Sequence, residues 1–560
     1  MMRSMKRMLM AALAAGVLLV PTASEALSLP IEVPSKRAAS NYFVASNYVN
    51  GQYDLDLNAN EYKEYSMKCG NQVVNFIAYE NIVYVRNPKD VAHQSLNIYI
   101  PKAYLDGRTV NGYAAKQAPI FMPNGVGGYM PGEILKPLEN DPMLGGANAT
   151  LYALSRGCVV VAPSIRGRTT VADGNYVGKA PAFIVDYKAA VAYVRHNRDN
   201  LPAGDPEKII SNGTSAGGAL SALLGTTGND PDYAPYLEEL GAAGIASNDI
   251  FAASIYCPIT NLDHADAAYE WTFNGTNEYY DTREPILGST ARADALSIES
   301  KVKNKVRSTI GDLMGNKQAG NESEPVQPTK MTQTETEISD ILKSEFSEYV
   351  NSLDLHDENG TLLTLDDKGN GTFKTYIKRK YMESAQEAIN DGADLSKVEW
   401  LTVKGKKVTD ADLSKYPAYV TRMKAAPAFD KLDMNKPSPE NDEFGTAKNI
   451  PQHFTMTAKR YETSLGAMAD ENVIRMMNPM NYIGGNARVA EHFRIRHGAA
   501  DRDTSLAIPA ILALKLQSRG ADVDFFAPWD RGHAGDYDLE ELFNWIDFIC
   551  KKDPTVPIKR

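Results

Sequence analysis

Short apolar segments alternate with longer amphipathic segments along two separate stretches of the chain. The first stretch predicts strands at residues 73–79, 96–100, 119–122, 159–162, 208–210 and 251–255, with helices at residues 181–196 and 219–224. The second stretch predicts strands at residues 492–497 and 523–527 and helices at residues 504–518 and 539–550. Strands and helices that alternate at this spacing are typical of an α/β fold built on a largely parallel sheet.

The segment between these stretches, residues 261–482, is rich in Asn, Asp, Glu, Lys and Thr. Within it, alternation of apolar and polar residues around a Gly/Asn turn predicts a β-hairpin over residues 361–373. The acidic residues of that turn lack the glutamate and the spacing of a calcium-binding loop, so we interpret the run as a plain turn. The long insertion predicts a lid domain at residues 261–482, over a core formed by residues 27–260 and 483–560.

One motif in the first stretch indicates a catalytic nucleophile. Residues 208–218 read KIISNGTSAGG, an apolar strand that runs into a G-x-S-x-G turn and then into a predicted helix. A serine on such a sharp turn is exposed at the top of the sheet, and small neighbours are needed because the turn is tight. The pattern therefore predicts Ser215 as the nucleophile and the amide of Ala216 as an oxyanion donor.

The partners of this serine are expected after the insertion, because the order along an α/β-hydrolase chain is nucleophile, acid and histidine. His533 follows the last predicted strand, and Asp501 and Asp503 follow the strand before it. His533 would take the proton of Ser215, while a carboxylate fixes its tautomer. The distance of each aspartate from the preceding strand is compatible with either one as the acid of the triad. The run His-Gly-x-x-Asp favours Asp501.

A glycine-rich loop is the expected source of the second oxyanion donor. Residues 120–129 read IFMPNGVGGY and follow an early predicted strand. Glycines let backbone amides approach a substrate oxygen that side chains would block. We predict Gly127 as the donor, with Val126 and Gly128 as neighbouring candidates.

The N-terminal sequence predicts that the protein is exported from the cytoplasm. Residues 1–26 combine a basic start, an apolar run at residues 9–20 and the small residues Ser24 and Ala26, which is the layout of a signal peptide cleaved near Ala26. The apolar run is shorter than the about 20 residues that a membrane span needs, so we expect a periplasmic or extracellular protein without stable membrane association.

Composition excludes other classes of function. The formal net charge is −11 and no run of Lys or Arg is present, which argues against a nucleic-acid partner. The four cysteines are widely spaced without a CxxC pair, so a thiolate metal site is not predicted, although one unassigned disulfide stays open in an oxidising compartment.

Four motifs together resemble the bacterial tannases (tannin acyl hydrolases, subtype B) of the α/β-hydrolase superfamily. They are PNGVGGYMPG at residues 123–132, NGTSAGG at 212–218, RHGAADRDTS at 496–505 and GHAGDYD at 532–538. The resemblance implies an α/β-hydrolase fold with a large inserted lid. It also implies hydrolysis of galloyl and protocatechuoyl esters, which releases gallic acid from hydrolysable tannins through an acyl-enzyme on Ser215. No metal and no organic cofactor is implied.

The resemblance further implies that a lysine and a glutamate of the lid, with an aspartate just beyond the triad acid, bind the aromatic hydroxyls. In this chain these residues map onto Lys424, Glu440 and Asp503, with Glu443 as the alternative glutamate. Asp501 and Asp503 would then have separate roles. The chemistry is consistent, because carboxylates accept hydrogen bonds from phenolic hydroxyls and an ammonium donates to their oxygens.

Three alternatives stay open at this point. A feruloyl or general carboxylesterase would use the same machinery, and an oligopeptidase-type serine peptidase has a similar acid turn. A hydrolase-fold protein that only binds a partner would usually lack one member of the triad. The fungal tannase and feruloyl esterase branch is disfavoured, because Thr214 and Gly532 stand where that branch has paired cysteines. The natural ester and the oligomeric state are not predicted.

Overall fold

The computed structural model describes residues 45–142, 144–244, 246–281 and 327–551. These residues belong to one compact unit of the chain. The predicted signal peptide, residues 1–26, lies outside the described residues.

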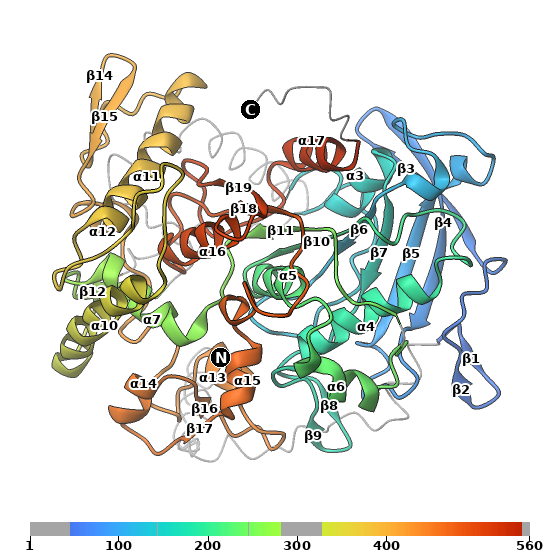
Figure 1. Ribbon diagram of the computed structural model, residues 1–560, viewed down its shortest axis with the longest axis horizontal. Helices are drawn as coiled ribbons and strands as arrows, with labels where there is room; N and C mark the ends of the chain where they lie inside the picture. Colours follow the sequence, from blue (N-terminus) through green and yellow to red (C-terminus); the bar gives the residue numbers. More distant parts are fainter. Residues whose placement is uncertain (1–44, 143, 245, 282–326, 552–560) are drawn as a thin grey trace, which may run out of the picture. The chain divides into compact units, whose positions relative to one another are not determined.

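A nine-stranded sheet forms the centre of this unit, in the order β19-β18-β11-β10-β6-β7-β5-β4-β3 (Figure 1). Its strands are β3 (Lys63–Cys69), β4 (Gln72–Val83), β5 (Ser95–Pro101), β6 (Ile120–Pro123), β7 (Val159–Pro163), β10 (Ile209–Thr214), β11 (Ala252–Tyr256), β18 (His492–Arg496) and β19 (Asp522–Phe526). All neighbours from β7 to β19 pair in parallel, whereas β7, β5, β4 and β3 pair antiparallel. The largely parallel α/β sheet is therefore confirmed.

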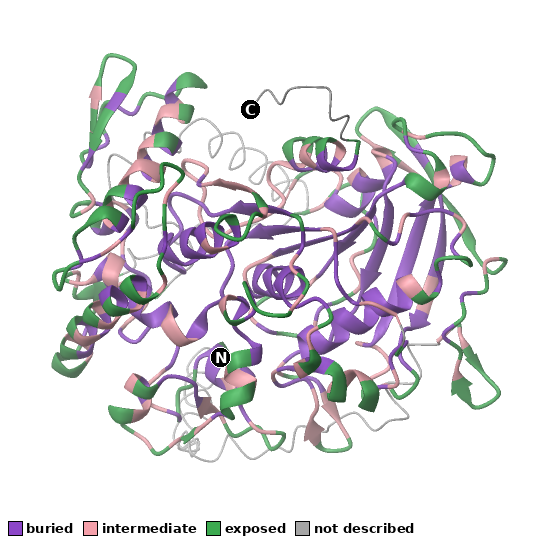
Figure 2. Cartoon of the chain, viewed as in Figure 1, coloured by how far each residue is buried: buried purple, intermediate pink, exposed green. Residues whose placement is uncertain are grey.

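Helices cover both faces of the sheet. One face carries α3 (Ala149–Ser155) and α17 (Leu539–Cys550), and the other carries α4 (Ala182–His196), α5 (Ala216–Thr226) and α16 (Ala507–Gln517). Figure 2 shows that the central strands and α5 are buried throughout, which explains why their sequences are almost continuously apolar. Shorter elements lie outside the sheet: β1 (Tyr48–Val49), β2 (Gln52–Tyr53), β8 (Val171–Ala172), β9 (Asn175–Tyr176) and α6 (Ala234–Glu239).

Between β11 and β18 the chain leaves the sheet, although these two strands are parallel neighbours within it. This insertion contains α7 (Leu262–Phe273), β12 (Glu278–Tyr279), β13 (Thr329–Lys330), α10 (Gln333–Ser352), α11 (Thr372–Asn390), β14 (Leu401–Lys404), β15 (Lys407–Ala411), α12 (Tyr416–Val420), α13 (Pro439–Glu443), β16 (Gln452–His453), α14 (Met456–Arg460), β17 (Ala467–Met468) and α15 (Glu471–Met476). The limits 261–482 of a separate lid domain remain a prediction.

The hairpin predicted over residues 361–373 is wrong. The run is a turn that leads directly into α11, which begins at Thr372. One oxygen of Asp366 accepts hydrogen bonds from the amides of Lys368 and Asn370 at 2.9 and 2.8 Å, and this closes the turn without a second strand. The hairpin of the insertion is formed later, by β14 and β15.

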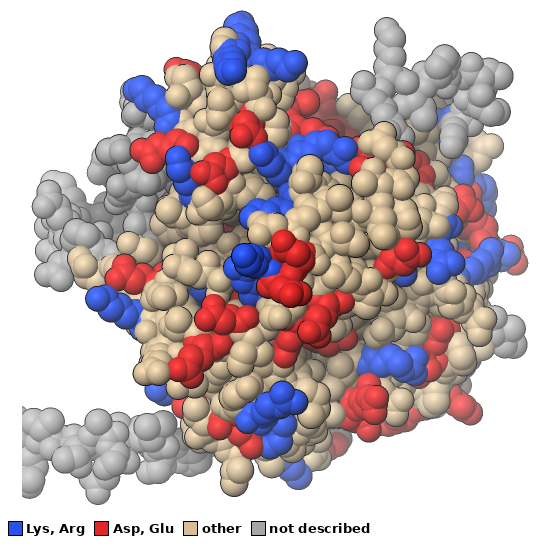
Figure 3. All heavy atoms as spheres, turned by 60° about the vertical axis from the view of Figure 1, so that its left-hand side comes forward, with Lys and Arg blue, Asp and Glu red and all other residues tan. Residues whose placement is uncertain are grey.

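Charges are mixed on the face that Figure 3 turns forward, where acidic and basic side chains are interspersed among other residues. That face lies on the left-hand side of Figure 1, around α10 and α11. Among the described residues, no helix is both long enough and apolar enough to cross a membrane.

Candidate active site

Ser215 lies at the turn between β10 and α5, with a backbone φ of 64° that is unusual for a serine. Its amide donates to the carbonyl of Tyr256 at 3.0 Å, which ties the turn to the neighbouring strand. The turn leaves no room for side chains on either side. A Cβ at Gly213 would lie 2.2 Å from the carbonyl oxygen of Gly217, and a Cβ at Gly217 would lie 2.5 Å from Asn124 Oδ1. The two glycines therefore permit the strained position of Ser215.

The ends of β18 and β19 bring an acid and a histidine together. His533 Nδ1 donates to Asp501 Oδ2 at 2.9 Å, and the other oxygen of Asp501 accepts from the amide of Asp503 at 2.8 Å. Burial alone would raise the pKa of Asp501, but the neighbouring His533 and His497 hold it below its ordinary value. Burial alone would lower the pKa of His533, but Asp501 raises it well above its ordinary value. The structure thus places Asp501, and not Asp503, against the histidine.

His533 Nε2 is buried and makes no hydrogen bond to the described residues. No hydrogen bond joins it to Ser215 Oγ in the part of the chain that the structure describes, and such contacts are often long when no substrate is bound. The free nitrogen is the atom that would accept the serine proton.

Two residues beside the pair were not assigned a site role from the sequence. His497 Nδ1 lies 3.8 Å from Asp501 Oδ2, and Cys257 Sγ lies 3.5 Å from the carbonyl oxygen of Ala534. The ligand atoms of Cys257, His497 and Asp501 lie within 4.8 Å of one another, which is the one such group found among the described residues. An ion held there would compete with His533 for the carboxylate of Asp501.

Only some of the residues predicted to hold the oxyanion line the cavity in front of Ser215. Ala216 is the first residue of α5 and lines the cavity in front of Ser215, as expected for a donor. The glycine-rich loop reaches this cavity with Gly128 and Tyr129, whereas Gly127 does not line it. The amide of Val126 is already bonded to Asn124 Oδ1 at 3.3 Å, which removes it as a candidate.

A cavity of about 880 Å³ extends from Ser215 into the insertion. Lys424, Glu440 and Asp503 all line it. Lys424 Nζ lies 2.6 Å from Asp503 Oδ1 and 3.9 Å from the centre of the Phe429 ring. Glu443 is fully buried and is not among the lining residues, so the choice between the two glutamates falls on Glu440.

Two of the carboxyl groups that line this cavity, those of Asp503 and Glu440, have opposite pKa shifts. Burial would raise the pKa of Asp503, but the ammonium of Lys424 holds it below its ordinary value. Burial raises the pKa of Glu440, and Lys424 opposes that rise only in part. Asp503 therefore stays an anionic acceptor at neutral pH, and Glu440 takes up a proton more readily.

Hydrogen bonds to helix α7, the first helix after core strand β11, hold the backbone at Lys424. The hydroxyl of Tyr269 on α7 accepts from the amides of Met423 and Lys424, both at 3.2 Å. Arg422 makes a bidentate ion pair with Glu270 on the same helix, and both side chains are fully buried. The role of these α7 residues was not predicted from the sequence, because their partners lie far along the chain and no local motif marks them.

Lys431 was also missed, although it lines the cavity near Lys424. Its Nζ donates to the carbonyl of Pro427 at 3.0 Å. A second lysine seven positions after Lys424 was a visible signal in the sequence, but without the fold it resembles any other surface lysine.

Comparisons with known proteins agree with this geometry. The BD-FAE family model matches residues 149–324. The tannin acyl hydrolase of Lactobacillus plantarum is 44% identical, with a TM-score of 0.78, over 89% of this chain and 99% of that protein. The tannase of Fusobacterium nucleatum is 46% identical, with a TM-score of 0.78, over 89% of this chain and 100% of that protein.

A shorter similarity covers only a small part of this chain. Esterase LipQ of Mycobacterium tuberculosis is 38% identical over 90 residues, which is 16% of this chain and 20% of that esterase. The similarity to solved tannases over 89% of this chain, together with the nine-stranded sheet, confirms both the resemblance and the α/β-hydrolase fold. This chain belongs to the tannases, the tannin acyl hydrolases, and is a carboxylic ester hydrolase.

Proposed function

We propose that this enzyme hydrolyses galloyl and protocatechuoyl esters of hydrolysable tannins and releases gallic acid. The observation that carries the proposal is the cavity that joins Ser215 to Lys424, Glu440 and Asp503. An ammonium and two carboxyl groups at one end suit a ring with adjacent phenolic hydroxyls, which can donate to carboxylates and accept from the lysine. Solved tannin acyl hydrolases that are 43% identical to this chain are described in complex with ethyl gallate and with 3,4-dihydroxybenzoate.

The reaction would proceed in two steps through an acyl-enzyme. Ser215 Oγ attacks the ester carbonyl and passes its proton to His533 Nε2, while the amide of Ala216 and the glycine-rich loop hold the oxyanion. The C–O bond to the alcohol breaks, and the alcohol leaves with the proton from His533. Water, deprotonated by His533, then attacks the acyl carbonyl, and the free acid leaves as Ser215 regains its proton.

Ester selectivity tests the substrate. We expect the purified protein to prefer methyl gallate over methyl ferulate by about a hundredfold or more in kcat/KM, because a methoxy group cannot donate to a carboxylate. Equal rates on the two esters would contradict a galloyl-specific site and favour a general carboxylesterase.

A trapped intermediate tests the mechanism. Acid quenching during turnover of propyl gallate should leave a galloyl adduct on the peptide that contains Ser215, seen by mass spectrometry. Ser215→Ala should carry no adduct and should lose about a millionfold in kcat. An adduct elsewhere, or turnover by the variant, would overturn the role of Ser215.

We also propose that the enzyme is exported after cleavage near Ala26. The support is the three-part layout of residues 1–26. Fractionation of cells that express the full chain, with N-terminal sequencing of the mature protein, tests this; a cytoplasmic protein that keeps residue 1 would contradict it.

A further inference from the structure

The two insertion residues proposed to bind the aromatic ring lie on short elements. Lys424 is in the loop between α12 and α13, and Glu440 is on α13, which has five residues. A helix of this length is not stable by itself, and a loop has no backbone ladder to hold it. Their positions must therefore be set by contacts with other parts of the chain.

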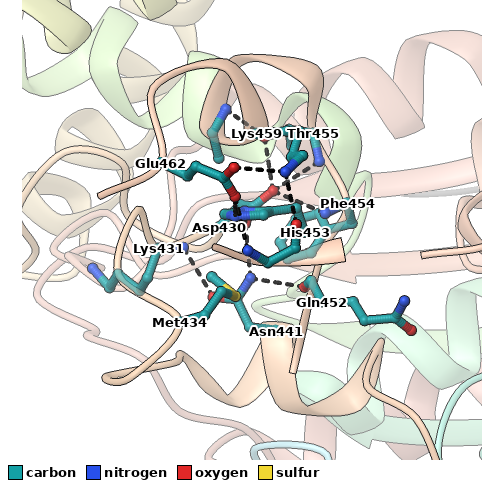
Figure 4. A network of polar contacts seen from close by, with 12 residues as sticks. Asp430, Lys431, Met434, Asn441, Gln452, His453, Phe454, Thr455, Lys459 and Glu462 are labelled. Carbon is teal, nitrogen blue, oxygen red and sulfur yellow. Dashed lines mark hydrogen bonds and ion pairs between the residues drawn. The ribbon is translucent and has the colours of Figure 1, made fainter. Parts of the chain in front are cut away.

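A buried carboxylate within this loop, that of Asp430, accepts five hydrogen bonds (Figure 4). Asp430 Oδ1 accepts from Asn441 Nδ2 at 2.7 Å and from His453 Nδ1 at 2.8 Å. Asp430 Oδ2 accepts from the amides of Phe454 and Thr455 at 2.9 and 2.7 Å, and from the hydroxyl of Thr455 at 2.9 Å. One carboxylate thus joins the loop to α13 and to the chain that follows β16.

His453 completes this network on its other side. Its side chain and that of Asp430 are both fully buried, and Nε2 lies 3.3 Å from Glu462 Oε2. Glu462 is held in turn by Lys459 Nζ at 2.6 Å. A Cβ at Gly466 would lie 2.9 Å from the imidazole, so the backbone packs closely against the ring. The imidazole is therefore held by its hydrogen bond to Asp430, lies against the carboxylate of Glu462, and is packed by the backbone at Gly466.

The network connects directly to both ring-binding residues. Phe429, which precedes Asp430, has the ammonium of Lys424 over its ring. Asn441, which follows Glu440, accepts from the amide of Lys431 at 2.9 Å through its Oδ1. A loop shift at Asp430 would therefore move the support of Lys424 and the start of α13 together.

Helix α7 anchors the same loop to the core. Asp266 on α7 accepts from the amides of Phe429 and Asp430 at 2.6 and 3.0 Å. Asp442 anchors the other side of α13, through Lys179 Nζ at 2.5 Å and through Arg168. With α7 and the core holding these outer ends, Asp430 joins the loop to α13 through Asn441 and to β16 through His453.

We infer that the buried pair Asp430–His453 is a positioning device for the ring-binding residues Lys424 and Glu440. This inference rests on the proposed galloyl function. Removing the imidazole leaves a buried carboxylate short of one donor, which costs more than an exposed hydrogen bond, so the loop must rearrange to satisfy it. A misplacement of about 1 Å far from the reacting atoms can cost about a hundredfold in rate.

The test compares two esters on the same variants. In His453→Leu, we expect kcat/KM for propyl gallate to fall about tenfold relative to kcat/KM for p-nitrophenyl acetate, chiefly through KM. His453→Asn keeps a donor near the Nδ1 position and should recover most of that ratio. Equal losses on both esters, or no change in the ratio, would overturn the inference.

Two further variants keep the test decisive. Asn351→Ala removes two hydrogen bonds of 2.8 Å to Leu365, elsewhere in the insertion, and should leave the ester ratio unchanged.

If His453→Leu does not fold, the isosteric Thr455→Val removes one of the five bonds to Asp430 and should lower the ratio about twofold to threefold. An unchanged ratio in Thr455→Val would then count against the inference.

Asp503→Asn separates this inference from the proposed function. If Asp503→Asn keeps the wild-type ester ratio, the galloyl function itself fails. If Asp503→Asn lowers the ratio and His453→Leu does not, the galloyl function stands and the positioning role is wrong.

Discussion

Lys424 Nζ lies 2.6 Å from Asp503 Oδ1, and this ion pair joins the insertion to the loop that carries Asp501. Asp503 and Asp501 are further linked by a hydrogen bond from the amide of one to the carboxylate of the other. The proposed ring-binding group is therefore connected through two short contacts to the acid that orients His533. In the proposed function, ring binding by Asp503 and catalysis by Asp501 would therefore depend on the same short segment of backbone.

Asp503→Asn removes the charge that pairs with Lys424 while keeping the shape of the side chain. We expect kcat/KM for propyl gallate to fall by between about tenfold and a hundredfold relative to p-nitrophenyl acetate, because a charge-assisted hydrogen bond is lost. Steady-state kinetics on the two esters checks this. A larger loss on the acetate ester than on the gallate ester would contradict a role in ring binding.

Asp501→Asn leaves an amide next to His533 and stabilises the wrong tautomer. We expect both esters to lose about ten-thousand-fold in kcat, without the selectivity change that Asp503→Asn produces. If Asp501→Asn had little effect and Asp503→Asn abolished both activities, the two roles would be exchanged.

The pH dependence of kcat/KM should reflect the raised pKa of His533. The general base must be neutral, so activity falls as the pH drops through this pKa, and a raised value puts the fall above the ordinary histidine value of about 6.5. A pH profile on p-nitrophenyl acetate measures it. Asp501→Asn removes the carboxylate that raises the pKa of His533. The acid limb of the profile, where activity falls at low pH, should therefore move to lower pH.

A matched control for the pH profile is available at the edge of the sheet. His492 Nδ1 pairs with Asp522 Oδ2 at 3.0 Å, where β18 and β19 begin, whereas Asp501 and His533 follow the other ends of these strands. Asp522→Asn should leave the acid limb where it is. A limb that moved equally in both variants would show that the shift is not specific to His533.

Glu270→Ala should destabilise the protein strongly. It leaves the fully buried guanidinium of Arg422 without its carboxylate, and breaking a buried pair on one side costs about 3–5 kcal/mol. Urea unfolding measures the loss. The double variant Glu270→Leu/Arg422→Met removes both charges and should recover most of the stability; no recovery would contradict a charge-based cost.

The triad could be predicted from the sequence because each member follows its own strand closely. Ser215 follows β10, Asp501 follows β18 and His533 follows β19, so local patterns and chain order were sufficient to propose them. The hairpin at residues 361–373 failed because alternation alone does not distinguish a second strand from a turn that starts a helix. Here Asp366 closes the turn and α11 follows.

What the sequence by itself determined was the α/β core, the strand-to-helix turn at Ser215 and the two late loops, since periodicity and glycine content are local properties. Only the tertiary structure decided that Asp501 faces His533, that Glu440 and not Glu443 lines the cavity, and that Gly128 lines it in place of Gly127. These choices lie between residues only a few positions apart. They depend on contacts between separate segments, such as that of His533 Nδ1 with Asp501 Oδ2, which no short-range pattern can predict.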